Sequence, residues 1–280
     1  MDISVIIPTH NRAELLPRAL DSVLEQTRPP DEIIVVDDGS DDGTDELVRR
    51  QYPSVRYLHQ RNRGVSAARN RGIAAAGGEW IALLDSDDSW LPGKLAAQRQ
   101  ALTEQPDHRI CHTEEIWIRN GKRVNAMKKH AKGGGHIYRR CLPLCVISPS
   151  SVLLHRGLLM ETGDFDESLP ACEDYDLWLR ICAREPVLFV EEPQIVKYGG
   201  HEDQLSRRHW GMDRFRIQAL EKILETGNLG TEDRAATLAM LAEKCEILAL
   251  GAEKRGDDQR AAAIRARPDR WIHPVESEDR

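Results

Sequence analysis

The sequence predicts an α/β protein in which helices cover both faces of a mostly parallel β-sheet. Three observations support this fold class. Short apolar, β-branched runs alternate with helical patterns over residues 1–105. These runs are apolar throughout, which is typical of parallel strands buried on both faces. The chain of 280 residues is 40% hydrophobic, so it can bury a large core.

The composition excludes several other classes: a disordered chain, a collagen and a disulfide-rich miniprotein. The chain has 39 Lys and Arg against 46 Asp and Glu, a net charge of −7, so we expect no nucleic-acid partner. No apolar run approaches the ~20 residues that span a bilayer, and the first run lacks the features of a signal peptide. The six cysteines form no C-x-x-C motif, which favours free thiols and a cytoplasmic location.

Strands and helices alternate from the N-terminus. Asn11 with Glu14 resembles a capping box before the first helix, whose apolar residues share one face. Gly77-Gly78 is a stop signal for an Ala-rich helix, and Pro92 is in the first turn of the next one. The expected strands are residues 3–7, 32–36, 55–58 and 80–84, and the expected helices are residues 15–24, 45–50, 66–76 and 92–105.

The rest of the chain is less regular. Asn120-Gly121 predicts a hairpin turn, and from about residue 212 the pattern is helical only. We therefore expect a first domain of residues 1–210, a helical extension of residues 211–268 and a polar tail of residues 269–280. The expected strands here are residues 116–118, 123–124, 151–154, 187–190 and 195–198, and the expected helices are residues 174–184, 215–224 and 232–254.

Carboxylates follow one of the predicted parallel strands, in Asp85-Ser86-Asp87-Asp88. Ligands bind at the carboxyl ends of such strands. Three carboxylates so close together repel one another, so a divalent cation or neighbouring Arg and Lys must offset their charge. Carboxylate oxygens suit Mg²⁺ or Mn²⁺, with phosphates of a substrate completing the coordination. The alternative is that these residues cap the helix at Pro92.

A second acidic turn, residues 37–44, follows another predicted strand. We expect Asp38 alone to contact a ligand, through a ribose hydroxyl or a base N–H, and the other residues to form a Gly-rich turn. The sequence contains neither G-x-G-x-x-G nor G-x-x-x-x-G-K-[ST], so a dinucleotide fingerprint and a P-loop are both excluded.

Together these segments resemble family 2 glycosyltransferases. Each motif is weak alone, but five occur in the family's order over about residues 1–208. The resemblance implies a GT-A fold, a nucleotide-diphosphate-sugar donor, a divalent metal and inversion at the anomeric carbon. It divides the first domain into a nucleotide-sugar-binding half, residues 1–105, and an acceptor-binding half, residues 106–210. The motifs are residues 5–12, 34–44, 62–72, 83–88 and 173–178.

The resemblance also assigns residues to the donor. Thr9 and Asp38 are expected against the nucleotide and Asp85 at the ribose, while Arg69 is expected at the base or the phosphates. Asp87 is expected to bind Mn²⁺ or Mg²⁺, which stabilises the leaving diphosphate. His201 is expected to ligate the metal or meet the diphosphate, its alternative being an ordinary surface or core histidine. The other expected donor-binding residues are Pro8, which shapes the turn, Asn11 and Arg12.

Inversion requires a base that removes the proton of the acceptor hydroxyl. The family motif points to Glu173-Asp174, with Asp174 the first choice and Glu173 the second. Asp174 opens a helix, whose dipole favours an ionised carboxylate. The alternative is that the pair only caps the helix.

Residues 122–140 contain seven Lys and Arg and no Asp or Glu. Without a counter-charge, they suggest an acceptor that is anionic or lipid-linked, or peripheral contact with the inner face of a membrane. The alternative is a solvated loop. We expect the C-terminal helices to pack on the catalytic domain or to form a homodimer.

The sequence thus predicts an inverting, metal-dependent transferase that acts in the synthesis of surface polysaccharide or glycoconjugate. UDP is the favoured nucleotide, with dTDP and GDP open. One rival is a non-catalytic nucleotide-sugar-binding protein, which the intact carboxylates argue against. The other is a sugar nucleotidyltransferase, which would need a Gly-rich phosphate loop with a lysine near the first strand.

Overall fold

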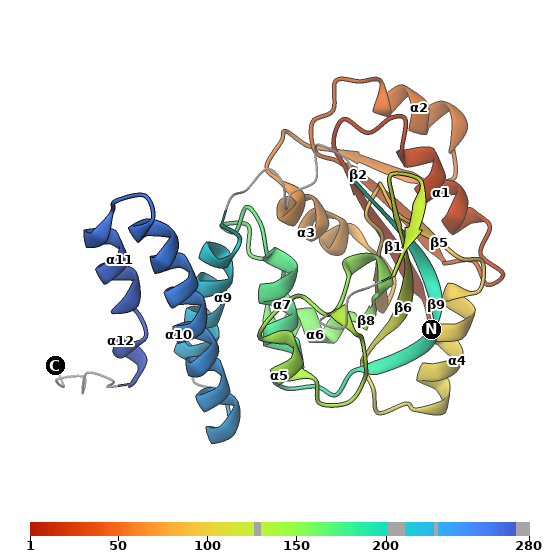
Figure 1. Cartoon of the computed structure of the whole chain (residues 1–280). Coiled ribbons are helices and arrows are strands. Elements are labelled where there is room, and N and C mark those ends of the chain that lie inside the picture. The colour runs from red at the N-terminus through yellow and green to blue at the C-terminus, as the bar shows by residue number, and fades with distance from the viewer. Residues whose placement is uncertain (126–129, 201–210, 227–228, 273–280) are drawn as a thin grey trace, which may run out of the picture.

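The computed structural model describes residues 1–125, 130–200, 211–226 and 229–272. It confirms an α/β fold, in which helices lie on both faces of one mixed sheet (Figure 1). Among the described residues the sheet has nine strands, and its order is β3-β2-β1-β4-β8-β6-β9-β5, with β7 paired to β6.

The N-terminal half of the sheet is parallel, as the apolar runs predict. β1 pairs with β2 on one side and with β4 on the other, and β3 pairs with β2. The carboxyl ends of all four strands therefore meet at one edge. Their bounds are Ile3–Thr9 for β1, Glu32–Asp37 for β2, Arg56–His59 for β3 and Trp80–Leu83 for β4.

The other half of the sheet is mixed. β8 is antiparallel to both β4 and β6, whereas β9 runs parallel to β6 and antiparallel to β5. The hairpin at Asn120-Gly121 is confirmed between β6 and β7. The bounds are Ser89–Trp90 for β5, Ile110–Arg119 for β6, Lys122–Val124 for β7, Leu153–His155 for β8 and Leu188–Gly199 for β9.

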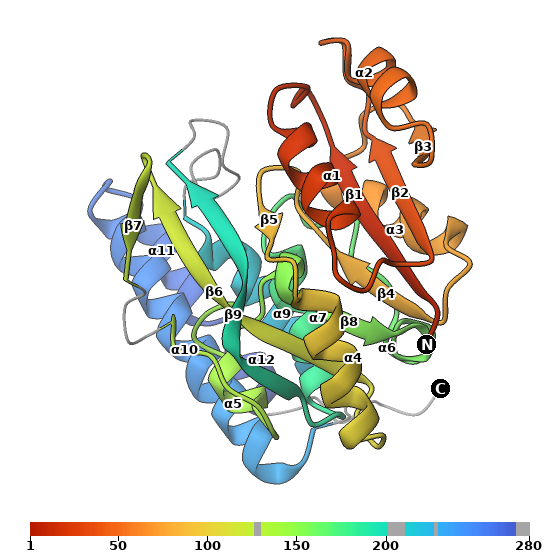
Figure 2. The same ribbon diagram turned by 90° about the vertical axis from the view of Figure 1, so that its right-hand side faces the viewer.

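Successive side chains of β1 point to opposite faces of the sheet, so β1 contributes to a hydrophobic core on each face. Ile3, Val5 and Ile7 pack with α1, α2 and α4, whereas Ile6 packs with α3 and the helices that follow β8. α1 and α4 lie in front of the sheet in Figure 2. The bounds are Leu16–Leu24 for α1, Thr44–Gln51 for α2, Val65–Ala75 for α3, Lys94–Glu104 for α4, Tyr138–Cys141 for α5, Arg156–Thr162 for α6 and Glu173–Cys182 for α7.

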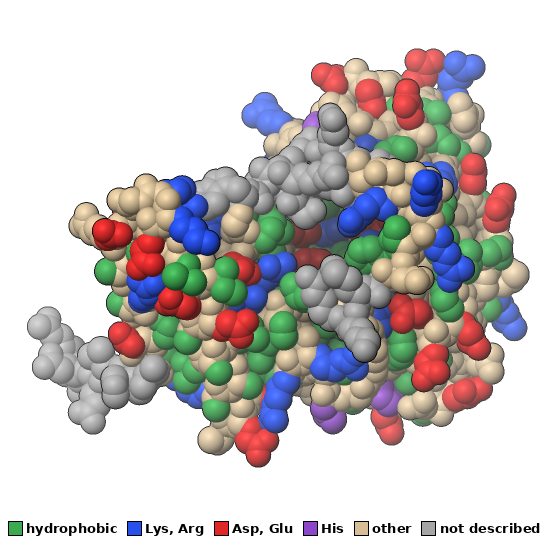
Figure 3. Space-filling model, in the orientation of Figure 1, with side chains coloured by type: hydrophobic (Ala, Val, Ile, Leu, Met, Phe, Trp, Pro, Cys, Tyr) green, Lys and Arg blue, Asp and Glu red, His purple; other side chains and the backbone are tan. Residues whose placement is uncertain are grey.

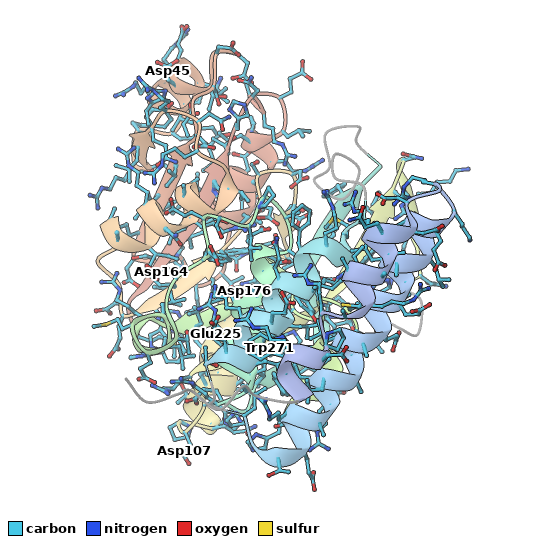
Figure 4. The ribbon with its side chains drawn as sticks, turned by 90° about the vertical axis from the view of Figure 1, so that its left-hand side faces the viewer. Asp45, Asp107, Asp164, Asp176, Glu225 and Trp271 are labelled. Atoms are coloured by element: carbon cyan, nitrogen blue, oxygen red, sulfur yellow. The ribbon has the colours of Figure 1, made fainter. Side chains whose placement is uncertain are left out.

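The C-terminal helices pack onto this second face. α9 (Asp213–Glu225) lies against α7 and α10 (Thr231–Glu253), and α11 (Asp258–Arg265) and α12 (Asp269–Ile272) follow. The buried carboxylate of Asp176, labelled in Figure 4, ties α7 to α9 by accepting from Lys222 Nζ at 3.1 Å. Asp176 is therefore part of the packing. No helix in the described part of the chain is long and apolar enough to cross a bilayer.

Two local predictions are wrong. Asn11 and Glu14 form no capping box, because α1 begins only at Leu16 and Asn11 adopts a left-handed φ of 51°. The strands expected at residues 187–190 and 195–198 are one strand, β9, whose pairing with β6 shifts register on both sides of Glu114. The polar residues between the two apolar runs belong to this irregular stretch.

Gly72 allows α3 to lie directly on β1. A Cβ atom at this position would lie 2.4 Å from Ile6 Cγ2 and 3.2 Å from Val36 Cγ2, both in the core. We expect Gly72→Ala to destabilise the protein by about 1–3 kcal/mol, because overpacking outweighs the better helix propensity of alanine. Urea unfolding measures the difference. Gly77→Ala is the matched control, since its Cβ would meet nothing closer than 3.7 Å, and equal unfolding of the two variants would contradict the packing argument.

Candidate active site

A cavity of about 430 Å³ opens at the carboxyl ends of the parallel strands. The ends of β1 and β4 and the starts of α3 and α7 border it, together with the end of β9. Figure 3 shows a hollow on the face seen in Figure 1, where acidic and basic side chains lie among hydrophobic ones. Most of the residues expected in the site line this cavity: Pro8, Thr9, Arg12, Asp38, Arg69, Asp85, Asp87, Glu173 and Asp174.

The hydroxyl of Thr9 lies at the end of β1 in the wall of the cavity. Its Oγ1 is buried and has no hydrogen-bond partner among the described residues. A buried hydroxyl without a partner is unfavourable in an empty site, and a polar ligand in the cavity can satisfy it.

Asp38 organises the loop that follows β3. Its carboxylate accepts hydrogen bonds from Gln60 Nε2 at 2.7 Å, from Arg63 N at 2.9 Å and from Gly64 N at 2.8 Å. The side chain is almost fully buried yet lines the cavity. Three of the roughly four acceptor positions of the carboxylate are thus occupied by the protein itself.

Positive side chains offset the repulsion in the turn after β4. Arg12 lies 3.0 Å from Asp87, and Arg69 donates to Asp85 at 2.8 Å. Burial alone would raise the pKa of Asp85, but the Arg69 guanidinium outweighs burial and holds this pKa below its usual range. Both paired carboxylates are partly accessible, with the Asp85 side chain 26% and the Asp87 side chain 15% exposed.

Asp88, the third carboxylate of this turn, is held by the protein. It accepts from Ser150 Oγ at 2.6 Å and from Tyr198 N at 3.2 Å, which connects the turn to the end of β9. Burial, together with the charges of Asp87 and Asp85, raises the pKa of Asp88 to about 8. The side chain is therefore largely protonated at neutral pH.

Arg69 connects the turn after β4 to α7. Besides Asp85, its guanidinium donates to Glu173 Oε1 at 2.7 Å, and both Arg69 and Glu173 are buried. Because the Glu173 carboxylate already accepts a hydrogen bond from Arg69, it is less available than the Asp174 carboxylate to accept the proton of an acceptor hydroxyl. Burial and the adjacent charge of Asp174 raise the pKa of Glu173.

Asp174, in the first turn of α7, faces the cavity and is only half-buried. Its Oδ1 accepts from Tyr175 N at 2.7 Å, and its Oδ2 accepts from Cys145 Sγ at 3.1 Å. Burial, with the nearby charge of Asp174, raises the pKa of Cys145 well above its usual value, so this thiol remains a neutral donor. The carboxylate is thus held at both oxygens and still accessible.

Two expected ligands are not in this lining. The Asn11 side chain accepts from Asp41 N at 2.9 Å and Asn11 N donates to Ser40 Oγ at 2.8 Å, which ties the loop after β1 to the loop after β2. Asn11 therefore shapes the site from outside the cavity wall. His201 lies outside the described residues.

Sequence reasoning missed two residues that line the cavity, His10 and Lys197. His10 Nε2 lies 3.0 Å from Asn62 Nδ2 at the cavity wall. Lys197 follows two apolar residues of β9. A single lysine in an apolar strand is a signal that could have indicated a buried functional cation.

The basic segment is not without counter-charges, so that expectation is corrected. Lys132 lies 3.2 Å from Glu115, and Arg139 binds Glu232 at 2.7 Å and Asp233 at 2.6 Å. These acids come from distant parts of the chain, which is why a local count of charges missed them. Residues 126–129 lie outside the described residues.

Among the described residues, no group of three His, Cys, Asp or Glu side chains could hold a metal by itself. The residues present do fit a cation bound together with a diphosphate, since one or two carboxylates plus substrate phosphates are the usual Mg²⁺ arrangement. Asp87 offers such a carboxylate at the cavity wall, with Arg12 as its present partner.

Relatives and solved structures resemble the chain. A glycosyltransferase of Rickettsia felis, described as uncharacterized, is 33% identical over 222 residues, which cover 74% of this chain and 35% of the relative. The chain thus spans about a third of that relative's length. A crystal structure of Staphylococcus aureus TarS 1–349 in complex with UDP-GlcNAc matches with a TM-score of 0.73 and 21% identity, covering 97% of this chain and 84% of TarS.

A second solved structure is the mannosyltransferase PcManGT of Pyrobaculum calidifontis in complex with GDP-Man and Mn²⁺. It has a TM-score of 0.59 and 21% identity and covers 98% of this chain and 88% of PcManGT. At these identities, both structures support the GT-A fold. The model of glycosyl transferase family 2 matches residues 4–160, more than half of the sequence. The chain is therefore a member of glycosyltransferase family 2.

Proposed function

We propose that this chain is an inverting enzyme that transfers a sugar from a UDP-sugar to a hydroxyl acceptor. One observation carries the proposal: the accessible Asp174 carboxylate, the Asp87 carboxylate and the unpartnered Thr9 hydroxyl line one cavity. The UDP-GlcNAc bound to TarS supports UDP as the nucleotide, while the GDP-Man bound to PcManGT keeps GDP as the alternative.

The donor would bind against the ends of β1 and β4. Thr9 Oγ1 would hydrogen-bond the nucleotide, and Asp38 would contact it with its remaining acceptor position while holding the loop of residues 60–64. Pro8 and Arg12 complete this wall. The contacts of Arg69 support a positioning role, because its guanidinium nitrogens donate to Asp85 and Glu173.

Asp174 would act as the base. Its carboxylate would accept the proton of the acceptor hydroxyl while the hydroxyl oxygen attacks the anomeric carbon and the bond to the diphosphate breaks on the opposite face. The thiol of Cys145 and the N–H of Tyr175 fix the orientation of the carboxylate. Glu173 is the weaker candidate because it is buried in its pair with Arg69.

A divalent cation, Mn²⁺ or Mg²⁺, would be held by Asp87. Bound there, the cation would neutralise charge that develops on the leaving diphosphate. Arg12, now paired with Asp87, would add a second positive charge near the same group. The assignment of His201 to this site stays a prediction.

We further propose that residues 1–210 form the catalytic domain and that residues 211–268 extend it. Donor contacts would come from residues 1–105 and acceptor contacts from residues 106–210. The acceptor would belong to a surface polysaccharide or glycoconjugate. Contact with a membrane surface and dimerisation through the C-terminal helices stay predictions. A non-catalytic binding protein remains the second candidate, and turnover separates the two.

Thr9→Val tests the donor site. Because Thr9 Oγ1 has no partner within the described protein, the variant should fold with unchanged or higher stability. It should nevertheless bind UDP about threefold to tenfold more weakly, the effect of one lost hydrogen bond. Calorimetric titration of both proteins with UDP and GDP in the presence of Mn²⁺ measures the difference.

Release of UDP from UDP-GlcNAc, followed with and without acceptor mixtures, is the test of catalysis. UDP binding without any release of UDP from the donor would favour the non-catalytic alternative. Absence of binding by UDP and GDP alike would contradict the proposed function as a whole.

A further inference from the structure

A second, smaller cavity of about 170 Å³ adjoins the first. Asp174 and Lys197 line both cavities, so the two meet at the proposed base. The other walls come from β6, the segment 144–148 and α9. A cavity of about 150 Å³ admits one benzene molecule, so this one has room for a single six-membered ring.

Two buried ammonium groups share one close carboxylate in this second cavity. Lys132 Nζ lies 3.2 Å from Glu115 Oε2, and these side chains are only 3% and 4% exposed. Lys197 Nζ donates to Ser148 Oγ at 3.2 Å. Burial lowers the pKa of Lys132, the charge of Lys197 adds to this shift and the charge of Glu115 opposes it.

A second carboxylate, Asp174, lines the same cavity at its boundary with the donor cavity and is held by Tyr175 N and Cys145 Sγ. Arg216 is bound to Asp213 at 2.8 Å, and Asp85 is bound to Arg69. Asp88, on the donor side of Lys197, accepts from Ser150 Oγ at 2.6 Å and from Tyr198 N at 3.2 Å. An anion placed between Lys132 and Lys197 would accept hydrogen bonds from two ammonium groups in a partly dehydrated site, where charge-assisted hydrogen bonds are strongest.

Trp117 adds an apolar surface to the same cavity. Its indole nitrogen donates to Glu115 Oε1 at 2.7 Å, and its ring centroid lies 5.6 Å from that of His130 and 5.7 Å from Lys197 Nζ. An aromatic ring beside a few placed polar groups is typical of a site that orients a small ligand.

We propose that the second cavity is an acceptor subsite that selects an acceptor carrying an anionic group, a carboxylate or a phosphate. The anion would bind Lys132 and Lys197 beside Ser148, and the attacking hydroxyl would face Asp174. This inference rests on the proposed function, since it needs a donor in the adjoining cavity. It assigns the recognition of negative charge to one buried lysine of the basic segment, Lys132, together with Lys197 of β9.

Matched pairs of small probes test the subsite. Ligand-detected NMR with UDP and Mn²⁺ present compares glucuronate with glucose, and glycerol 1-phosphate with glycerol. We expect the charged member to bind about tenfold more tightly or better in at least one pair. The pair with the larger ratio identifies the anion as a carboxylate or a phosphate.

Lys132→Met should abolish this preference while UDP affinity stays unchanged, because Lys132 lines only the second cavity. Arg139→Gln is the matched control, since Arg139 belongs to the same basic segment but pairs with Glu232 and Asp233 at the surface. It should keep the preference. If Lys132→Met does not fold, Ser148→Ala should weaken binding of the charged probe about threefold.

Equal binding of charged and neutral probes by the natural protein would contradict the proposed subsite. A preference for the charged probe that persists in Lys132→Met would contradict it as well. In either case intact UDP binding would leave the proposed function standing. A natural protein that binds neither UDP nor GDP would remove the proposed function and the subsite with it.

Discussion

Replacing Asp174 with asparagine is expected to lower sugar transfer by about 10²–10⁴-fold, the range that one general base contributes. Asparagine has nearly the same shape, and its Oδ1 can still accept from Tyr175 N, so the start of α7 should remain intact. It cannot take a proton from the acceptor. UDP affinity should stay within about twofold, because the proposed partner of Asp174 is the acceptor hydroxyl and not the nucleotide.

The measurement is kcat for transfer, with UDP binding determined on the same sample. Glu173→Gln is the comparison, because it removes the neighbouring carboxylate that pairs with Arg69. We expect it to lose stability and donor affinity as well as turnover, since the buried Arg69 loses one of its two compensating charges. Normal turnover in Asp174→Asn would transfer the role of base to another group.

Asp87→Asn is expected to remove the part of UDP affinity that depends on Mn²⁺, a loss of about 100-fold or more when one carboxylate carries the cation. An amide oxygen is a weaker ligand for a hard cation than a carboxylate. Removing the Asp87 carboxylate, which lies 3.0 Å from Arg12, also leaves the positive charge at this wall of the cavity less offset. Residual binding without metal should therefore persist. Calorimetry with UDP, with and without Mn²⁺, measures both parts.

Asp88→Asn is the matched control one residue away. Because Asp88 is largely protonated at neutral pH, asparagine is a close substitute, and the hydroxyl of Ser150 can rotate to suit it. The gain in affinity from Mn²⁺ should survive in this variant. An equal loss of the Mn²⁺-dependent UDP affinity in both variants would indicate that the turn itself is disrupted. An unchanged Mn²⁺-dependent affinity in Asp87→Asn would mean that other residues hold the cation.

The parallel half of the sheet could be predicted because its signals are local. The strands β1, β2 and β4 are short, mostly apolar runs, and polar residues follow directly. The carboxyl ends of such strands meet at one edge, so Thr9, Asp38 and Asp85 could be placed in one site without coordinates. Asp174 was predicted only from the family motif, because it lies at the start of a helix and not at the carboxyl end of a strand.

The second half of the sheet could be predicted only in part, because the pairing of its strands depends on distant residues. β9 appears as two apolar runs in the sequence, and only pairing with β6 joins them across the irregular stretch. The interaction of Cys145 with Asp174 spans 29 residues, and the pair of Lys132 with Glu115 depends on the same tertiary packing. Local periodicity and charge counts contain no information on such contacts.

The double pairing of Arg69 has a mechanical consequence. A single buried guanidinium joins the turn that would face the leaving group to the helix that bears the proposed base, across 16 residues on one side and 104 on the other. The two reacting regions are thereby fixed to each other before substrate arrives, so little reorganisation energy is required at the moment of displacement. Large hinge motion between the halves of the enzyme would break this connection, and substrate entry must therefore rely on segments that Arg69 does not hold.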